Sequence, residues 1–187
     1  MSAPKALYLT TAKGAFTVGV APIRKPGPGK LLVKIHATAL NPADWIRHAL
    51  DIMIDKYPTI LGEDLSGTVE ELGEGVTSFK VGDRVITEAT FNVLEGASFQ
   101  QYALATANLT AKIPDSLSFE EAASIPLGIT TAAIGLYSKV GGAGLFPPWE
   151  EGGRGLYRGK PIVVFGGASS VGQFGVWQEI IVRPVAD

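Results

Sequence analysis

The sequence has no cysteine among its 187 residues and only two histidines. The lack of thiols excludes disulfides, thiolate zinc sites, iron–sulfur clusters and a cysteine nucleophile, and it favours a reducing compartment. The two histidines, His36 and His48, do not combine with the carboxylates into a recognisable set of metal ligands. The residue types present therefore point away from metal chemistry.

Long apolar runs and an excess of one charge are also missing. No run approaches the roughly 20 apolar residues that span a bilayer, and residues 1–12 hold no apolar stretch typical of a signal peptide. Lys and Arg total 16 against 18 for Asp and Glu, which gives no electrostatic reason to bind nucleic acid or an anionic membrane. We therefore expect a cytoplasmic protein with neither nucleic acid nor a membrane as partner.

The first part of the chain consists of short apolar runs separated by Gly and Pro. About eight such runs precede residue 113, and they predict antiparallel strands that close wholly or partly into a small barrel. In the run Leu31–Leu40 the odd-numbered residues are apolar, so we expect them to face the core. Asn41 followed by Pro42 is typical of a helix start and predicts a short helix over residues 43–50.

The pattern changes after Pro114, and we expect one domain over residues 1–117 and a second over 118–187. Ser118 to Glu121 matches a capping box, and residues 122–139 predict two helical pieces because Pro126 and Gly128 interrupt the apolar run. Seven glycines over residues 141–159 indicate a loop. The β-branched run 161–165 then predicts a strand buried on both faces of a parallel sheet.

A glycine-rich turn follows that strand, and a helix is expected to begin at Ser170 or Val171. A strand, such a turn and a helix together open dinucleotide-binding folds, because glycine lets the backbone approach a pyrophosphate and the helix amides hold its charge. The match to G-x-G-x-x-G is partial, with serine at the middle glycine, so a plain strand–turn–helix is the alternative. The candidate cofactor-binding residues are Gly166, Gly167, Ala168, Ser169, Ser170, Val171 and Gly172.

Six consecutive motifs resemble those of the medium-chain dehydrogenase/reductase superfamily. They are NPADW at 41–45, YPTILGEDLSGTV at 57–69, VTSFKVGDRV at 76–85, ASFQQY at 97–102, KIPD at 112–115 and EEAASIPL at 120–127. The resemblance covers about residues 5–175 and is nearest to the zinc-independent quinone and enoyl reductases, particularly fungal trans-acting enoyl reductases. It implies an α/β protein, in which a GroES-like, mostly antiparallel β barrel is followed by the truncated start of a Rossmann domain.

The resemblance also implies an oxidoreductase that transfers hydride from NAD(P)H to an activated C=C, as in an enoyl or enone substrate, or to a quinone. It implies NADP(H) in preference to NAD(H), although the residues that would read the ribose phosphate are not in the sequence. Zinc-dependent relatives carry Cys at or next to the position of Asn41 and His at the position of Glu63. We therefore expect no zinc.

By the same resemblance, Asn41 and Asp44 would line the cleft where substrate and nicotinamide meet. Thr131, with Thr130 as a weaker choice, would contact the nicotinamide side, and Asn41, Asp44 and Thr131 are the candidate catalytic residues. Each has a structural alternative: Asn41 as a helix cap, Asp44 as a charge in the first helical turn and Thr131 as a helix residue.

Five further side chains are candidates for the site. The adjacent carboxylates Glu63 and Asp64 are expected to face opposite sides of a strand and to be non-catalytic. Tyr57 could donate a proton but is typical of packing, His48 could contact substrate, and His36 is expected to have no chemical role.

The resemblance breaks after residue 177, where the sequence departs from the usual continuation of the family. This predicts a truncated cofactor domain, with a strand whose open edges favour a homodimer or a partner chain that completes the sheet. The alternative to a reductase is thus a catalytically inactive GroES-like module or subunit that acts through protein partners.

Overall fold

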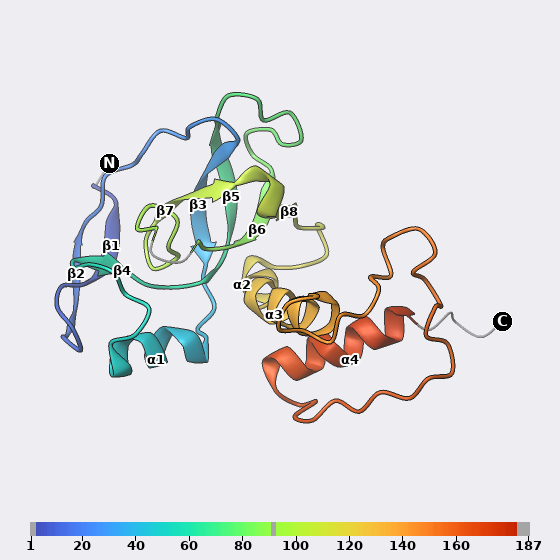
Figure 1. Ribbon diagram of the computed structural model, residues 1–187. Coiled ribbons are helices and arrows are strands. Elements are labelled where there is room, and N and C mark those ends of the chain that lie inside the picture. The colour runs from blue at the N-terminus through green and yellow to red at the C-terminus, as the bar shows by residue number, and fades with distance from the viewer. Residues whose placement is uncertain (1–2, 91–92, 183–187) are drawn as a thin grey trace. The chain divides into compact units, whose positions relative to one another are not determined.

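The computed structural model describes residues 3–90 and 93–182, and they form two compact units. The first unit spans Met1–Pro126 and the second Leu127–Asp187, so the division falls nine residues after the expected boundary at 117. Figure 1 shows the elements in chain order. The strands are β1 Lys5–Leu9, β2 Phe16–Val20, β3 Lys30–Ala37, β4 Thr59–Ile60, β5 Asp64–Leu72, β6 Arg84–Glu88, β7 Tyr102–Thr106 and β8 Thr110–Lys112.

The first unit is a curled, antiparallel half-barrel, as the sequence predicts. Its larger sheet has the order β7-β3-β5-β6-β8, and its smaller sheet has the order β2-β1-β4. The described residues up to 113 hold eight strands, which confirms the number expected from the apolar runs. In β3 the expected core face is confirmed, because Leu31 and Val33 are fully buried while Lys34 and His36 are exposed.

The barrel core is formed by leucine, valine and alanine side chains from β3, β5, β6 and β7. The buried cluster consists of Leu31, Val33, Leu65, Val69, Val85, Ala103 and Ala105. The neighbouring antiparallel strands β3 and β5 approach each other closely where Gly67 pairs with Ile35. A Cβ atom on Gly67 would stand 2.1 Å from the Lys34 carbonyl oxygen, so only glycine allows the two strands this approach.

Two helices of the first unit begin where the sequence predicts. Helix α1, Pro42–Leu50, follows Asn41 and lies at the end of the barrel where β4 ends and β5 begins (Figure 1). Helix α2, Phe119–Ala123, is capped by Ser118, whose hydroxyl accepts the Glu121 amide at 3.1 Å. The short 3-10 helix η1, Ala107–Leu109, joins β7 to β8.

Helix α2 is held to the sheet by aromatic and hydrogen-bond contacts of Phe119. The Phe119 ring stacks on His36 at a centroid distance of 4.3 Å, and the Arg84 guanidinium lies 4.6 Å from the same ring. The Ser66 hydroxyl donates to the Phe119 carbonyl at 2.6 Å. These contacts attach the start of α2 to the larger sheet, a few residues before the second unit begins.

The second unit contains α3, Pro126–Tyr137, and α4, Ser170–Val182, joined by a loop that covers residues 141–159 as expected. The expected break between two helical pieces is confirmed, since α2 ends at Ala123 and α3 begins at Pro126. Gly128 of α3 faces Phe174 of α4, and a Cβ at Gly128 would meet the Phe174 ring at 2.6 Å. No helix in the described part of the chain is long and apolar enough to cross a membrane.

The strand expected at residues 161–165 is not formed. These residues have no strand assignment, and the exposed fractions are 74% for Val163 and 93% for Phe165. The second unit offers no strand among its described residues with which this run could pair. An apolar, β-branched run becomes a buried strand only when neighbouring strands take up its backbone hydrogen bonds.

We expect Gly67→Ala to lower the free energy of unfolding by about 1–3 kcal/mol, because the added methyl group would clash with the backbone of β3. Gly27→Ala is the matched control, since nothing lies within 4 Å of a Cβ at Gly27. Urea unfolding followed by tryptophan fluorescence measures both variants. Equal stabilities for the two variants would contradict the close approach at Gly67.

Candidate functional site

Asn41 and Asp44 are brought together at the start of α1. The Asp44 carboxylate accepts the Asn41 backbone N–H at 2.8 Å, which is one half of a capping box. The Asn41 side chain is half-buried and donates from Nδ2 to the Asp64 carboxylate at 2.8 Å. A carboxylate only accepts, so Asp64 fixes which end of the Asn41 amide faces it and leaves one Nδ2 hydrogen of Asn41 for another partner.

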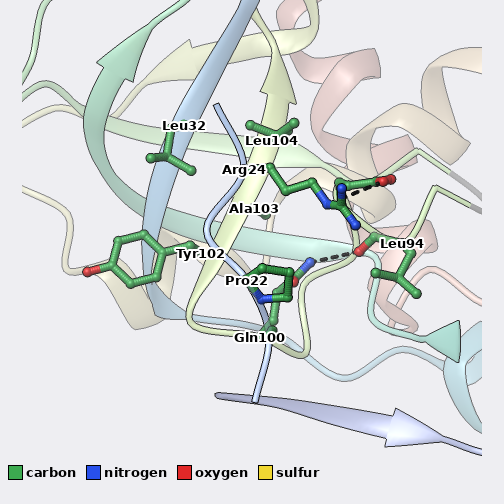
Figure 2. A pocket seen from close by; sticks show the side chains of 10 residues that line it. Pro22, Arg24, Leu32, Leu94, Gln100, Tyr102, Ala103 and Leu104 are labelled. Atoms are coloured by element: carbon green, nitrogen blue, oxygen red, sulfur yellow. Dashed lines mark hydrogen bonds and ion pairs between the residues drawn. The ribbon is translucent and has the colours of Figure 1, made fainter. Parts of the chain in front are cut away.

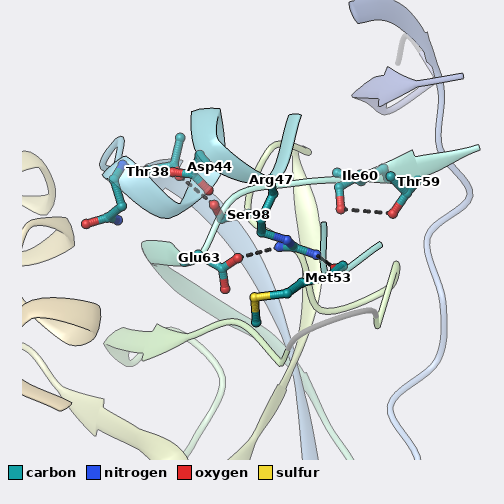
Figure 3. Close-up of polar contacts among 9 residues, drawn as sticks. Thr38, Asp44, Arg47, Met53, Thr59, Ile60, Glu63 and Ser98 are labelled. Atoms are coloured by element: carbon teal, nitrogen blue, oxygen red, sulfur yellow. Dashed lines mark hydrogen bonds and ion pairs between the residues drawn. The ribbon is translucent and has the colours of Figure 1, made fainter. Parts of the chain in front are cut away.

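Beneath this helix start lies a buried ion pair. The Arg47 guanidinium donates from Nη1 to Glu63 Oε1 at 2.5 Å and from Nη2 to the Met53 carbonyl at 3.0 Å (Figure 3). The exposed fraction is 4% for Arg47 and 1% for Glu63. Glu63 Oε2 is buried and has no hydrogen-bond partner among the described residues. The guanidinium and the carboxyl group therefore face each other in the protein interior, away from solvent.

Both members of the adjacent carboxylate pair turn out to contact the same helix region. Glu63 lies just before β5 and bonds to Arg47, while Asp64 is the first residue of β5 and bonds to Asn41. The simple alternation that predicts opposite faces applies only within a strand, and Glu63 stands outside it. We still expect neither carboxylate to be catalytic.

Contacts with Thr38 and Ser98 hold the segment that carries these two carboxylates. Gly62 has φ of 98°, and a Cβ there would stand 2.2 Å from Ser98 Oγ, so glycine is required on both counts. The Thr38 hydroxyl donates to the Asp64 carbonyl at 2.6 Å and lies 2.6 Å from the Ser98 hydroxyl (Figure 3). The backbone of Asp64 is therefore held in place by Thr38 while its carboxylate bonds to Asn41.

Burial controls the protonation of the two carboxyl groups nearest Arg47. Burial raises the pKa of Glu63 to about 7, against the opposing effect of Arg47 and with a further upward contribution from Asp44. Burial also raises the pKa of Asp44, although the amides of Asn41 and Gly62 and the charge of Arg47 act in the other direction. One guanidinium thus cannot hold all its neighbouring carboxyl groups ionised at neutral pH.

The glycine-rich turn belongs to the second unit and leads into α4, which begins at Ser170 as predicted. The Ser169 hydroxyl accepts the Gly172 amide at 3.1 Å and caps the helix. A Cβ at Gly172 would stand 2.1 Å from the Gly166 carbonyl oxygen, and Gly166 itself has φ of 71°. The turn is therefore tight, and the Ser169 hydroxyl accepts the cap bond without using its own hydrogen.

The third predicted catalytic residue, Thr131, also lies in the second unit, on the exposed side of α3. An open surface groove of about 570 Å³ on this unit is lined by Thr130, Tyr137 and Trp149, among other residues, but not by Thr131. The predicted site residues thus come from two compact units: Asn41 and Asp44 from the first, and Thr131 and the turn from the second. Their functional roles stay predictions.

The other candidates are engaged in local contacts. His48 Nε2 lies 2.7 Å from the Gly14 carbonyl oxygen, and its ring packs on Phe16. The Tyr57 hydroxyl donates to the Asp51 carboxylate, and this hydrogen bond raises the pKa of Tyr57, which makes it a weaker proton donor. His36 Nε2 lies 3.0 Å from the Thr68 hydroxyl.

A small enclosed space elsewhere in the barrel is no ligand site. It is lined by Pro22, Leu94 and Leu104 and closed by the Arg24–Glu95 ion pair at 3.6 Å (Figure 2). Its volume of about 10 Å³ suits at most one water molecule. It contains none of the predicted site residues.

Arg47 is the site residue that the sequence did not single out. Asp44 and Arg47 are spaced i,i+3 and so share one face of α1, and a short acidic motif follows at residues 63–64. A charged pair on the inward face of a short helix is a signal that could have found it. Within residues 3–90 and 93–182, no group of three or more His, Cys, Asp or Glu is arranged to hold a metal ion.

Comparison with known proteins defines the class of protein. Residues 27–115 match the alcohol dehydrogenase GroES-like domain, which agrees with the curled half-barrel of the first unit. The chain belongs to the medium-chain dehydrogenase/reductase superfamily, as its motifs predict.

Particular relatives support this assignment. The chain is 42% identical over 163 residues to dehydrogenase pigH of Monascus ruber, covering 83% of this chain and 43% of pigH. It is 37% identical to trans-enoyl reductase fsr4 of Gibberella fujikuroi, covering 83% of this chain and 44% of fsr4. The structure resembles mycobacterial Rv1454c complexed with NADPH at 32% identity and a TM-score of 0.62, covering 74% of this chain and 42% of that one. The chain spans about half the length of the curated relatives it matches.

We expect the stabilising contribution of Glu63 to fall as the pH rises from 4.5 to about 7, because the folded protein holds this proton to about pH 7 while the unfolded chain releases it near 4.5. The full loss is of the order of 3 kcal/mol. Glu63→Gln removes the titration, so its unfolding free energy is expected to have a smaller downward slope over this range. Urea unfolding at intervals of pH measures both slopes, and parallel curves would contradict the prediction.

Proposed function

We propose that this chain carries the substrate side, and the start of the cofactor side, of an oxidoreductase that transfers hydride from NAD(P)H to an activated C=C. The acceptor is an enoyl or enone compound, with a quinone as the alternative acceptor for the same chemistry. The observation that carries the proposal is the Asn41 amide, which is half-buried, oriented by Asp64 and left with one donor hydrogen. The name of the relative fsr4, a trans-enoyl reductase, favours the enoyl class.

The proposed role of Asn41 is to stabilise negative charge on the acceptor. Hydride addition to the β-carbon of an enone shifts the C=C electron pair toward the carbonyl carbon and the C=O pair onto oxygen, and the resulting enolate takes a proton from solvent water at its α-carbon. A fixed N–H donor beside that oxygen stabilises the developing charge without having to reorganise. Thr131 is the proposed second donor, through its hydroxyl group. Asp44 holds the start of the helix that carries Asn41.

The cofactor side of the proposal rests on the turn from Gly166 to Gly172. Gly166 and Gly172 allow a close backbone approach, and the Ser169 hydroxyl keeps a hydrogen for a phosphate oxygen. When bound, NADPH supplies the hydride. Preference for NADP(H) is proposed from the likeness to a structure complexed with NADPH, and we propose that no zinc takes part.

A second candidate function is a GroES-like module that binds a protein partner and has no activity. The observation in its favour is the unformed strand at residues 161–165, which leaves Phe165 almost fully exposed. A dinucleotide-binding domain holds its turn at the end of a paired strand. Titration with NADPH and NADH, followed by nicotinamide fluorescence and by melting temperature, separates the two functions, since a ligand of the folded state raises stability. Absence of binding by folded, monodisperse protein would overturn the reductase proposal.

We expect Asn41→Ala to lower kcat for NADPH-dependent enone reduction by about 10²–10³-fold, because it removes a charge-stabilising donor. The dissociation constant for NADPH is expected to stay within twofold of the parent value. Asn108→Ala is the matched control, since Asn108 is an exposed amide on η1. Continuous assays that follow nicotinamide absorbance measure kcat. An unchanged kcat for Asn41→Ala would remove Asn41 from the mechanism.

A further inference from the structure

Side-chain hydrogen bonds of Asn41 and Arg47 attach the start of α1 to residues 63–64 of the barrel. Asn41 bonds to the Asp64 carboxylate at 2.8 Å, and Arg47 bonds to the Glu63 carboxylate at 2.5 Å. These two bonds lie nearly two helical turns apart along α1 and reach consecutive residues of one segment. The helix is thus held at two points against residues 63–64.

The barrel side of this attachment is rigid. The Ser98 amide donates to the Gly62 carbonyl at 3.0 Å, and the Ala89 amide donates to the Glu63 carbonyl at 2.6 Å. Thr38 holds the Asp64 carbonyl, as described above. Because these bonds hold residues 62–64 to the barrel, the orientation of the Asn41 amide depends on where α1 lies relative to them.

On the helix side, Arg47 makes the bonds that set this position. Its planar guanidinium joins three chain segments: α1 itself, the Met53 carbonyl after the helix and Glu63 before β5. Truncating one member of a buried pair leaves the other charge without a partner, whereas replacing both by apolar groups restores a neutral interior. Replacing both removes the two charges together and leaves Asp44 as the buried carboxyl group, which keeps its hydrogen bonds from the amides of Asn41 and Gly62.

We propose that Arg47 and Glu63 are positioning residues for Asn41: their buried ion pair fixes the place of α1 and, through it, the direction in which the Asn41 amide presents its free hydrogen. The catalytic consequence rests on the proposed reductase function. The positional consequence does not, because the environment of the Asn41 amide can be observed without substrate or cofactor.

The test compares Arg47→Met with the double variant Arg47→Met/Glu63→Leu. We expect the single variant to lose melting temperature and the double variant to regain most of it. The readout of position is the pair of Asn41 side-chain NH₂ signals in a ¹H–¹⁵N correlation spectrum, assigned by their loss in Asn41→Asp. In the double variant we expect these signals to stay displaced, and kcat to stay about tenfold to a hundredfold below the parent value with NADPH binding unchanged.

Two controls make the outcome decisive. Lys112→Met breaks the exposed Lys112–Asp83 ion pair, whose atoms are 2.9 Å apart, and is expected to leave the Asn41 signals in place. Arg47→Lys keeps the charge and is expected to restore the signals in part. A double variant with regained stability and parental Asn41 signals would overturn the proposal and make the pair merely structural. If the parent protein neither binds NADPH nor turns over, the reductase function fails while the spectra still decide the positional role.

Discussion

The guanidinium of Arg47 lies inside the barrel end, and the local structure is arranged around the need to neutralise it. A buried cation is stable only where carboxylates and carbonyl oxygens replace water, and Glu63 and Met53 meet that need. The partners come from both sides of β4, so satisfying one charge brings a helix, a loop and the start of a strand together. Burial, with a smaller upward contribution from the charge of Asp44, raises the pKa of Glu63 to about 7 against the opposing effect of Arg47.

Most of the first unit could be predicted from sequence because its signals are local. Alternation in β3, the Asn41-Pro42 helix start and the Ser118 capping box each depend on a few neighbouring residues, and each is observed. The run at 161–165 shows the limit of such signals. Its β-branched composition is that of a buried strand, but a strand exists only with partners to pair with, and composition does not say whether those partners are present.

The candidate site was predicted only in part, for a related reason. The family motifs located Asn41 and Asp44, and the structure joins them through the capping bond. They gave no indication that Asp64 would orient the Asn41 amide or that Arg47 would be buried beneath it, because these contacts join residues 16 and 23 positions apart. Reasoning from strand alternation failed at Glu63, since that residue precedes the strand and follows the unusual backbone of Gly62.

The hydrogen bond between Thr38 and Ser98 closes a chain separation of 60 residues. Such a contact exists only while the chain between its two residues returns to the same place, and closing that loop costs entropy. The hydroxyl pair that supports Asp64 therefore depends on the strands that lie between Thr38 and Ser98 in the sequence. The orientation of the Asn41 amide is thus coupled to the integrity of the barrel, and a variant that loosens those strands is expected to disturb it without touching α1.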